Sequence, residues 1–428
     1  MLDIRFIREH RDIVAKAIKD KKGKPVDLDL VIRLADERKA LQQSIAEVNQ
    51  GRNVAQAERD KEKGKEFKEK AQKFEMELTR VEKEFVALMI QIPNIPSPDT
   101  PVGPDEKANK VIRQWGEKPQ FSFQPKEHWE LGYALGVLDT EKAGLISGPR
   151  FAYLMGDLVL MQFALIKLCI EVLTNAETLK SIAEKAGISI NTKPFIPVLP
   201  PTIMKSAVMN RMARLQPIEE RYFFEKDDLV FVGSAEHTLG PLHMDEVIPE
   251  CDLPIRYVGY SVAYRREAGT YGKDTKGILR QHQFDKVEME TFCMPEHSYQ
   301  EQDFLVAIQE HIMRMLGVPY QVVLISTGDM GAPDHRQIDI ECWMPGQGVY
   351  RETHSADLIQ GYQARRLNAR VKRADLSIEP VHMNDATVLA IGRTLIAIME
   401  NNQRADGSIS IPEVLRAHVG KNEIIKNN

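Results

Sequence analysis

The chain has 428 residues, of which 43% are hydrophobic and 28% are charged. This length predicts roughly two to three domains with a large core, and the composition is that of a soluble globular protein. The net charge of −5 excludes a uniformly basic surface, but it leaves nucleic-acid binding open, because that needs only a local stripe of Lys and Arg.

The cysteines and the apolar segments indicate where the chain functions. Its four cysteines are far apart and form no CxxC pair, so neither a structural zinc site nor a disulfide framework is expected. The N-terminal run MLDIRFIREH lacks the apolar core of a secretory signal. Residues 158–173 form the most apolar segment, but polar side chains interrupt it and it is too short to span a bilayer. We therefore expect a cytoplasmic protein without a membrane segment.

The strongest periodicity lies in residues 28–92, after short helices expected around residues 4–19. A polar break at residues 59–65 separates two halves, which predicts two helices joined by a short Gly-containing turn. The hairpin would be an antiparallel coiled coil about 30 residues long per helix, or roughly 45 Å. Apolar residues that recur in heptads are Val31, Leu34, Leu41, Ile45, Val48 and Ala55 in the first half, and Phe67, Ala71, Phe74, Leu78, Val81, Phe85, Leu88 and Ile92 in the second.

A proline-rich segment follows the predicted hairpin. Residues 93–104 read PNIPSPDTPVGP and contain five prolines, which stiffen a connection and stop helices and central strands. We expect a helical arm domain at 1–92, a linker at 93–110 and a second domain at 111–428.

The second domain begins with alternating short strands and helices. A long apolar helix is expected at residues 156–175, followed by a strand that ends in Pro within residues 194–201. This pair resembles motif 1 of class II aminoacyl-tRNA synthetases, which builds their dimer interface.

Residues 262–290 predict two strands around a glycine-rich basic loop. Val262–Tyr264 lead in, and residues 284–289 alternate polar with apolar side chains as a half-buried strand does. Glycine lets a backbone approach a ligand and Arg binds phosphate oxygens in a bidentate fork, so the loop could clamp a polyphosphate. A solvated hairpin with a charged tip is the alternative. The loop carries Gly269, Gly272, Gly277, Arg265, Arg266, Lys273, Lys276 and Arg280.

The runs REAG, GILR and HQFDKVEM in this stretch resemble motif 2 of class II synthetases, and specifically that of seryl-tRNA synthetases. The resemblance covers nearly the whole chain. It implies an α+β fold, with a mostly antiparallel sheet flanked by helices and an N-terminal antiparallel coiled-coil arm, and it implies serine–tRNA ligase activity. Further matching segments are residues 231–236, 327–329, 339–343, 351–355, 363–366, 390–393 (motif 3) and 411–416.

The resemblance implies an ATP site that works by positioning and charge neutralisation. Arg265 would bridge the substrate carboxylate and the α-phosphate, Phe284 and Arg393 would hold the two faces of adenine, and Glu352 with Ser355 would hold Mg²⁺. Phe284 could instead be core and Arg393 could pair with an acid, but the joint match in order and spacing favours the site. The implied ATP-binding residues are Arg265, Arg266, Glu267, Gln281, Phe284, Glu352, Thr353, His354, Ser355 and Arg393, of which Arg265, Glu267 and Arg393 would be catalytic.

The implied amino-acid pocket must hydrogen-bond the serine hydroxyl, which discriminates against Ala and Gly. Glu288 and Thr387 would grip the serine amine and hydroxyl. The implied serine-binding residues are Ser234, Ala235, Glu236, Arg265, Glu288, Asp385 and Thr387.

Three stretches depart from the family pattern, of which the smallest change is Ser234-Ala235-Glu236 in place of the usual Thr-x-Glu, which keeps the hydroxyl. The usual Asn-Gly-Ser or Asn-Ala-Thr is Asp385-Ala386-Thr387 here, and the usual Ser-Ser-Cys-Ser-Asn is His354-Ser355-Ala356-Asp357-Leu358. A carboxylate in place of an amide near a carboxylate substrate weakens binding unless it pairs with a cation or serves the ammonium group.

The implied partners are L-serine, ATP, tRNA(Ser), tRNA(Sec) where the host has one, and a second copy of the chain in a homodimer. The arm would grip the long variable arm of the tRNA, although acids alternate with its basic residues and a solvated face is the alternative for each. The candidate RNA contacts are Arg52, Arg59, Lys61, Lys63 and Lys65.

Two other functions make different predictions for this sequence. A synthetase paralogue that loads a carrier protein typically lacks the arm, which is unbroken here. A noncatalytic RNA-binding scaffold would predict loss of Arg265, Glu267, Glu352 or Arg393, and all four are present.

Overall fold

The computed structural model describes residues 1–268 and 276–426 and divides the chain into two compact units. Unit 1 comprises residues 1–96 with 331–333, and unit 2 comprises residues 97–330 with the chain from residue 334. The predicted loop residues Gly269, Gly272 and Lys273 lie outside the described residues.

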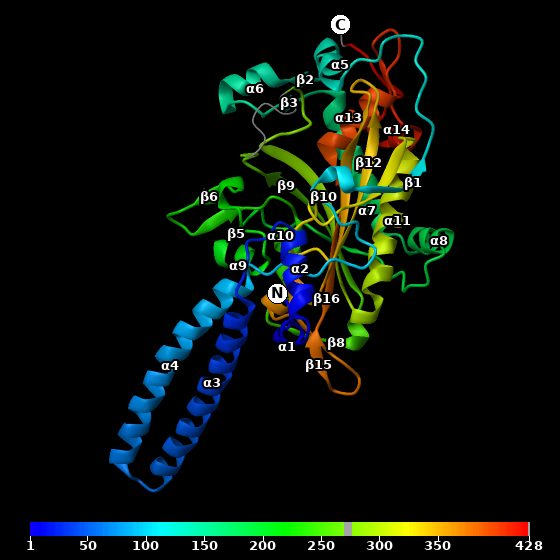
Figure 1. Cartoon of the computed structure of the whole chain (residues 1–428). Coiled ribbons are helices and arrows are strands. Elements are labelled where there is room, and N and C mark those ends of the chain that lie inside the picture. Colours follow the sequence, from blue (N-terminus) through cyan, green and yellow to red (C-terminus); the bar gives the residue numbers. More distant parts are fainter. Residues whose placement is uncertain (269–275, 427–428) are drawn as a thin grey trace. The chain divides into compact units, whose positions relative to one another are not determined.

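The helices and strands are drawn in Figure 1. The helices are α1 (Ile4–Glu9), α2 (Arg11–Asp20), α3 (Leu28–Ala57), α4 (Lys61–Met89), α5 (His128–Leu135), α6 (Thr140–Ser147), α7 (Asp157–Thr174), α8 (Ala176–Ala186), α9 (Ser206–Arg211), α10 (Glu236–Leu239), α11 (Ser298–Leu316), α12 (Gly361–Leu367), α13 (Ile391–Asn401) and α14 (Glu413–Val419). The strands are β1 (Lys110–Trp115), β2 (Leu138–Asp139), β3 (Tyr153–Leu154), β4 (Ile196–Val198), β5 (Ile203–Lys205), β6 (Phe223–Phe224), β7 (Leu229–Phe231), β8 (Val247–Pro249), β9 (Ile255–Tyr264), β10 (Gln283–Cys293), β11 (Tyr320–Leu324), β12 (Arg336–Met344), β13 (Val349–Gln360), β14 (Arg370–Lys372), β15 (Ile378–Pro380), β16 (His382–Ala390), β17 (Ile409–Ser410) and β18 (Glu423–Ile424).

Unit 1 contains the predicted helical hairpin. Helices α3 and α4 run side by side (Figure 1) and bury apolar seam positions such as Ala55, Ala71 and Val81. Gly51 in α3 lets the ring of Phe67 lie against the helix, since a Cβ there would be 2.7 Å from that ring. The expected coiled-coil hairpin is therefore confirmed.

The turn of the hairpin is shorter than expected and contains no glycine. Asp60 caps α4 by accepting a hydrogen bond from the Lys63 N–H at 3.1 Å, so the helix begins at Lys61 and Gly64 lies inside it. Arg59, which lies in the turn, has a positive φ of 57°. The cap at Asp60 explains why the polar break is helical.

The two short helices before the hairpin pack against α3. Arg8 of α1 pairs with Asp36 at 2.6 Å, and Arg11 of α2 pairs with Asp29 at 2.6 Å. Ile7 and Val14 supply buried apolar side chains to the same unit. The helices predicted near residues 4–19 are thus present.

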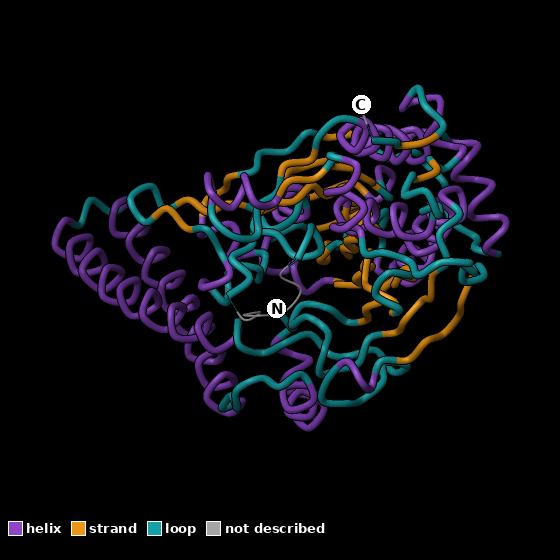
Figure 2. The backbone as a smooth tube through the Cα atoms, turned by 90° about the horizontal axis from the view of Figure 1, so that it is seen from above, coloured by secondary structure: helices purple, strands orange, loops and turns teal. Residues whose placement is uncertain are grey.

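Unit 2 is organised by an eight-stranded sheet in the order β1-β11-β12-β13-β16-β10-β9-β4. All neighbouring strands in it are antiparallel except β4 and β9. Figure 2 shows the strands gathered together within this unit, with helical segments around them. The mostly antiparallel sheet expected from the resemblance is therefore confirmed.

The central strands of this sheet separate two environments. Successive side chains of a strand point to opposite faces, and α11 packs on one face, where Gln309 donates to the carbonyls of Ser355 and Thr387 at 2.8 and 2.7 Å. The core takes Val287, Met289, Ala356, Ala386 and Val388, and the other residues of the alternation are Lys286, Glu288, Glu290, Ser355, Asp357, Asp385 and Thr387.

The motif 1 region differs from its prediction in one respect. Helix α7 and strand β4 lie where expected, but α8 stands between them. Asn175 caps α8 by accepting from the Thr178 N–H at 2.9 Å, a signal that the apolar pattern alone does not carry.

In the described part of the chain, no helix combines the length and apolar character needed to cross a membrane.

Candidate active site

The β9–β10 hairpin supplies the centre of the site. The two strands pair from Tyr264 opposite Gln283, and Arg265 follows β9 directly. Its Nε donates to the Gly233 carbonyl at 3.2 Å, and its guanidinium carbon lies 5.4 Å from the centre of the Phe284 ring. Arg265 thus connects the strand pair with the segment that carries Ser234.

Glu267 and Arg280 close the described ends of the loop. Arg280 Nη1 lies 3.2 Å from Glu267 Oε2, and Glu267 has a positive φ of 51°. A non-glycine residue in this conformation is uncommon and reflects local constraint. Two further predicted ATP residues flank the loop: Arg266 lies 5.7 Å from the Tyr222 ring, and Gln281 precedes β10.

The far end of the loop is anchored to two helices. The Ile278 N–H donates to His128 Nε2 at 3.1 Å, and His128 Nδ1 lies 3.3 Å from Glu400 at the end of α13. Gly277 has a φ of +68°, and a Cβ there would lie 2.0 Å from His128 Nε2. Only glycine fits this close approach.

Glu352 and Arg393, both predicted at the ATP end, form a direct pair. Arg393 in the first turn of α13 donates to the Glu352 carbonyl at 2.8 Å and lies 3.2 Å from its carboxylate. Arg393, with smaller contributions from Arg265 and Lys286, lowers the pKa of Glu352 below its ordinary value. The carboxylate side chain is 51% exposed, so it is open to a ligand.

The side chains of the two residues after Glu352 are buried. A bulge in β13 opposite Ile340 leaves Thr353 as the extra residue, and its hydroxyl donates to the Ile340 carbonyl at 3.2 Å. The ring of His354 is buried against Thr353, and burial lowers its pKa to about 3. Only the backbone of these two predicted ATP residues could face a ligand.

Carboxylates gather beside Glu352. Asp339 lies opposite Ser355 and Glu341 lies opposite Glu352 in the pairing of β12 with β13. Burial and the neighbouring Glu352 raise the pKa of Asp339 well above its ordinary value. The carboxylates of Asp339, Glu341 and Glu352 repel one another, and the Ser355 hydroxyl is nearby. Such oxygen atoms are the hard ligands that Mg²⁺ prefers, so this donor set fits the ion.

The predicted serine residues meet on β10 and β16. Thr387 Oγ1 donates to Glu288 Oε1 at 3.4 Å, and both side chains are buried. Lys286 Nζ lies 2.9 Å from Glu288 Oε2 and 3.3 Å from Ser234 Oγ. Ala235 is buried beside them. Burial raises the pKa of Glu288 although Lys286 opposes the shift.

The cation that contacts the other carboxylates, Arg214, belongs to none of the sequence motifs above. Arg214 Nε lies 2.7 Å from Glu236, and its Nη2 lies 3.5 Å from Asp385. Burial would raise the pKa of Glu236, but Arg214 and other cations lower it to about 2. In contrast, burial and Glu236 raise the pKa of Asp385 well above its ordinary value. Glu236 is therefore ionised, while the pKa of Asp385 is shifted upward although both carboxyl groups contact Arg214.

Other missed residues had different signals in the sequence. Lys286 and Glu290 alternate with Glu288 on β10, so a polar face was visible in the period of two. His237, whose Nδ1 accepts from the Gly233 N–H at 3.1 Å, and Arg221 lie outside long periodic elements. Burial lowers the pKa of His237 to about 3, so the ring is neutral.

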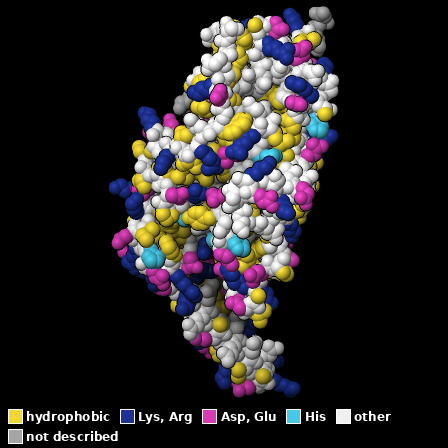
Figure 3. Space-filling model, turned by 90° about the vertical axis from the view of Figure 1, so that its right-hand side faces the viewer, with side chains coloured by type: hydrophobic (Ala, Val, Ile, Leu, Met, Phe, Trp, Pro, Cys, Tyr) yellow, Lys and Arg dark blue, Asp and Glu magenta, His cyan; other side chains and the backbone are white. Residues whose placement is uncertain are grey.

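The five candidate RNA contacts lie at the far end of the hairpin and are all exposed. Lys63 pairs with Asp60 at 3.2 Å, as expected of a solvated helix surface. On the face of the molecule in Figure 3, basic and acidic side chains are interspersed. The arrangement leaves these residues accessible without singling out one of them.

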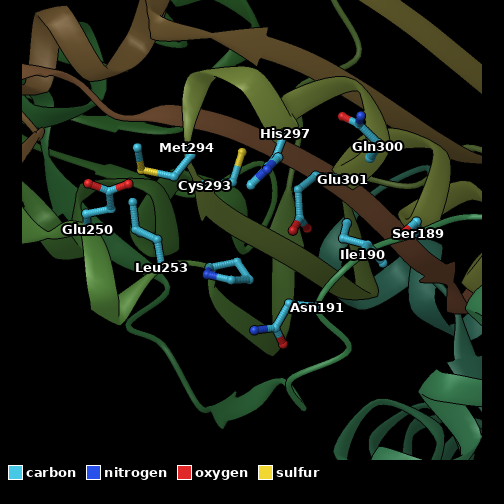
Figure 4. A pocket seen from close by; sticks show the side chains of 11 residues that line it. Ser189, Ile190, Asn191, Glu250, Leu253, Cys293, Met294, His297, Gln300 and Glu301 are labelled. Atoms are coloured by element: carbon cyan, nitrogen blue, oxygen red, sulfur yellow. The ribbon is translucent and has the colours of Figure 1, made fainter. Parts of the chain in front are cut away.

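A separate cavity lies away from the site. It measures about 400 Å³ and is lined by residues such as Glu250, Cys293, His297 and Glu301 (Figure 4). Glu301 in it already pairs with the buried Arg256 at 2.6 Å. None of the predicted site residues lines this cavity.

Comparisons with known proteins match both units. The family described as the seryl-tRNA synthetase N-terminal domain matches residues 1–96, and the tRNA synthetase class II core domain (G, H, P, S and T) matches residues 222–402. A serine–tRNA ligase of Syntrophobacter fumaroxidans is 38% identical over 441 residues, covering 99% of this chain and 100% of the relative. One of Thermodesulfovibrio yellowstonii is 38% identical over 437 residues, covering 98% and 99%.

Solved structures agree with these relatives. The seryl-tRNA synthetase of Pyrococcus horikoshii, complexed with ATP, has a TM-score of 0.85 at 33% identity and covers 100% of both chains. The cytoplasmic serine–tRNA ligase of Naegleria fowleri, in complex with AMP, has a TM-score of 0.81 at 29% identity, covering 100% of this chain and 99% of its own. With its helical hairpin, its antiparallel sheet and these full-length matches, the chain belongs to the seryl-tRNA synthetase family of class II aminoacyl-tRNA synthetases.

Proposed function

We propose that the chain activates L-serine with ATP to form seryl-adenylate and then transfers the seryl group to tRNA(Ser). The observation that carries this proposal is the buried pair of Glu288 and Thr387, 3.4 Å apart. Ser234 and Lys286 are next to it. These groups offer hydrogen bonds to an ammonium and a small hydroxyl, and Arg265 is near enough to both Glu288 and Glu352 to lower their pKa values.

In the first step, a carboxylate oxygen of serine attacks the α-phosphorus of ATP, and the bond to pyrophosphate breaks. Negative charges must meet in this step, so catalysis depends on positioning and charge neutralisation. Arg265 would bind the serine carboxylate and the α-phosphate together. Phe284 and Arg393 would hold the adenine ring between them, with Glu267 at its edge.

The carboxylates beside Glu352 would hold Mg²⁺ with the ATP phosphates. Glu352 and Ser355 are the proposed ligands, with Asp339 behind them. When bound, the ion neutralises phosphate charge and orients the oxygens. Arg393 would keep Glu352 ionised and directed toward it, as their 3.2 Å separation supports.

Selection of serine would depend on its hydroxyl. A buried site that hydrogen-bonds a substrate hydroxyl rejects an analogue without one, because its own polar groups are then left unpaired. Glu288 and Thr387 would together bind the amine and the hydroxyl of serine. Ser234 and Glu236 would add further contacts to the amine. Alanine would supply the ammonium group but would leave the partner of the hydroxyl unpaired.

In the second step, a hydroxyl of the terminal tRNA ribose attacks the seryl carbonyl carbon, and AMP leaves. The helical arm would hold the tRNA through the basic residues near its tip, from Arg52 to Lys65. A homodimer is supported by exposed apolar side chains on and after α6 and α7, among them Leu145, Phe163 and Leu199. The tRNA(Sec) would be a further substrate where the host has one.

Serine-dependent ATP–pyrophosphate exchange, followed by charging of a tRNA with a long variable arm, tests the proposal. Exchange with serine and charging of tRNA(Ser) are expected. No exchange with serine would contradict the proposal, and exchange without charging would favour a paralogue that loads a carrier protein. A protein that binds the tRNA but shows neither reaction would be a noncatalytic scaffold.

The role of the arm has its own test. Arg38 bonds Glu82 at 3.1 Å, so residues 39 and 81 lie on opposite helices at nearly the same level. Residues 40–80 can therefore be replaced by a short Gly-Ser linker without disturbing the base of the hairpin. We expect normal exchange and loss of charging. Charging at the original rate would exclude the arm as the RNA grip.

A further inference from the structure

Two of the departures from the family pattern lie opposite each other. Asp357 on β13 and Asp385 on β16 are direct partners in the strand pairing. Glu290 on β10 lies opposite Asp385 on its other side. Three carboxyl groups thus form one row across three neighbouring strands, and the family pattern has an uncharged residue at two of these positions.

One arginine faces this row. Arg214 Nη2 lies 3.5 Å from Asp385 Oδ2, 3.8 Å from Asp357 Oδ2 and 3.6 Å from Asp334 Oδ1. The same guanidinium reaches Glu236 through Nε at 2.7 Å. The arginine side chain is only 16% exposed, so few water molecules can replace these contacts.

The backbone around Arg214 is fixed by side chains from outside the row. Arg221 donates twice to the Arg214 carbonyl, at 2.9 and 2.7 Å. Gln363 of α12 donates to the Met212 carbonyl at 3.0 Å, and Arg366 donates to the Arg211 carbonyl at 2.7 Å. The Gln-Ala-Arg-Arg motif therefore holds the segment that presents Arg214.

This arrangement leaves atoms for a ligand. Asp385 turns Oδ2 to Arg214, and its Oδ1 is buried without a hydrogen-bond partner among the described residues. Carboxylate oxygens of Glu236, Glu288 and Asp385 all lie within 4.8 Å of one another. Arg214 and Lys286 already balance charge in this group, so a substrate ammonium or hydroxyl suits the space better than a divalent ion.

We propose that Arg214, Asp357 and Asp385 form one coupled unit, in which Arg214 positions Glu236 and Asp385 as the wall of the serine pocket. The unit takes the place of the uncharged wall in the family pattern. Removing Arg214 alone leaves the buried Asp357 and Asp385 without the cation that they share. This should lower the free energy of unfolding more than removing all three charged groups together. The assignment of serine as the ligand rests on the proposed function.

The kinetic test uses ATP–pyrophosphate exchange with serine and ATP varied separately. Arg214→Gln is expected to raise the KM for serine about tenfold or more, the effect of losing at least one charged hydrogen bond, with the KM for ATP within about twofold of its original value. Arg214→Lys should recover part of the loss, since it keeps the charge. The matched control is Arg113→Gln. Arg113 lies on the distant β1 and pairs with Glu310 at 2.7 Å, so its replacement should change neither KM.

The coupling test adds Asp357→Asn and Asp385→Asn to Arg214→Gln. The triple variant should bind serine better than Arg214→Gln alone. Its free energy of unfolding should be higher than the value obtained by adding the losses measured for the separate variants. The unfolding cycle does not depend on serine being the substrate, so it separates this proposal from the proposed function. Additive unfolding free energies, or equal rises in the KM for serine and ATP, would overturn the coupled unit. If Arg214→Gln does not fold, folding of the triple variant would support the unit, and its failure would overturn it.

Discussion

The amino-acid end and the ATP end of the site lie on one sheet but treat charge differently. At the amino-acid end, the Glu288 side chain is 0% exposed and its carboxylate contacts Lys286 and Thr387. At the ATP end, Glu352 is 51% exposed and meets Arg393. Buried charges are fixed before a ligand arrives, whereas exposed ones can rearrange around phosphates and a metal ion. Selection of the substrate should therefore be decided at the buried end.

Replacing the residue between the two ends should have the largest effect. Arg265→Ala removes the proposed contact to the carboxylate and the α-phosphate, and we expect exchange to slow by about 10²–10³-fold, or about 2.7–4 kcal/mol. Arg373→Ala, which breaks an exposed pair with Glu296, serves as the control and should leave the rate unchanged. Nearly normal exchange in Arg265→Ala would remove this residue from the reaction.

A pair of isosteric variants tests the contrast between the ends. Glu288→Gln should raise the KM for serine by an amount equivalent to about 1.5–3 kcal/mol, the range for hydrogen bonds to charged groups, and leave the KM for ATP nearly unchanged. Glu352→Gln should do the reverse and raise the Mg²⁺ requirement. Steady-state exchange with each substrate varied measures both. If the two variants have the same profile, the site does not have two distinct ends.

The anchor of the loop should affect stability more than selectivity. Gly277→Ala introduces a Cβ that clashes with His128 at a left-handed position, and we expect a loss of about 1–3 kcal/mol in the free energy of unfolding. Gly420→Ala is matched in conformation, with a φ of +77°, but has open space around it, so its loss should be smaller. Urea unfolding monitored by fluorescence compares them, and equal losses would argue against the His128 contact.

The smallest effect on activity is expected at Glu290. Burial and the nearby Asp385 raise its pKa well above 4.5, so the folded chain keeps a proton that the unfolded chain releases. Stability from this group is complete below pH 4.5 and falls as the pH rises toward the folded-state pKa. Glu290→Gln cannot lose a proton, so the variant should be the more stable protein at neutral pH and equal to the original near pH 4. Parallel curves of unfolding free energy against pH would contradict the shift.

The sequence predicted elements whose signals are periodic or local in the chain. The heptads gave α3 and α4, and the alternation in residues 284–289 gave β10. The turn between α3 and α4 was expected within residues 59–65 because a polar run resembles a loop, whereas α4 already begins at Lys61. Helix α8 was missed for a similar reason, since its apolar stripe is short.

The site was predicted in composition but not in its connections. The family motifs predicted Glu288, Thr387, Glu352 and Arg393 as site residues. In the structure, Glu288 contacts Thr387 and Glu352 contacts Arg393. Arg214 belongs to no recognised motif and contacts acids that are far from it in the chain, so no local pattern could assign it. The register of β13 with β16 places Asp357 opposite Asp385, and this pairing could not be seen in the sequence.

Discrimination between serine and alanine by the unmodified protein tests the central claim most directly. If a buried pair grips the hydroxyl, the ratio of kcat/KM for serine to that for alanine in ATP–pyrophosphate exchange should be about 10⁴ or more, as for sites that hydrogen-bond a substrate hydroxyl. A ratio near 10, the value for a pocket that recognises size alone, would contradict the account.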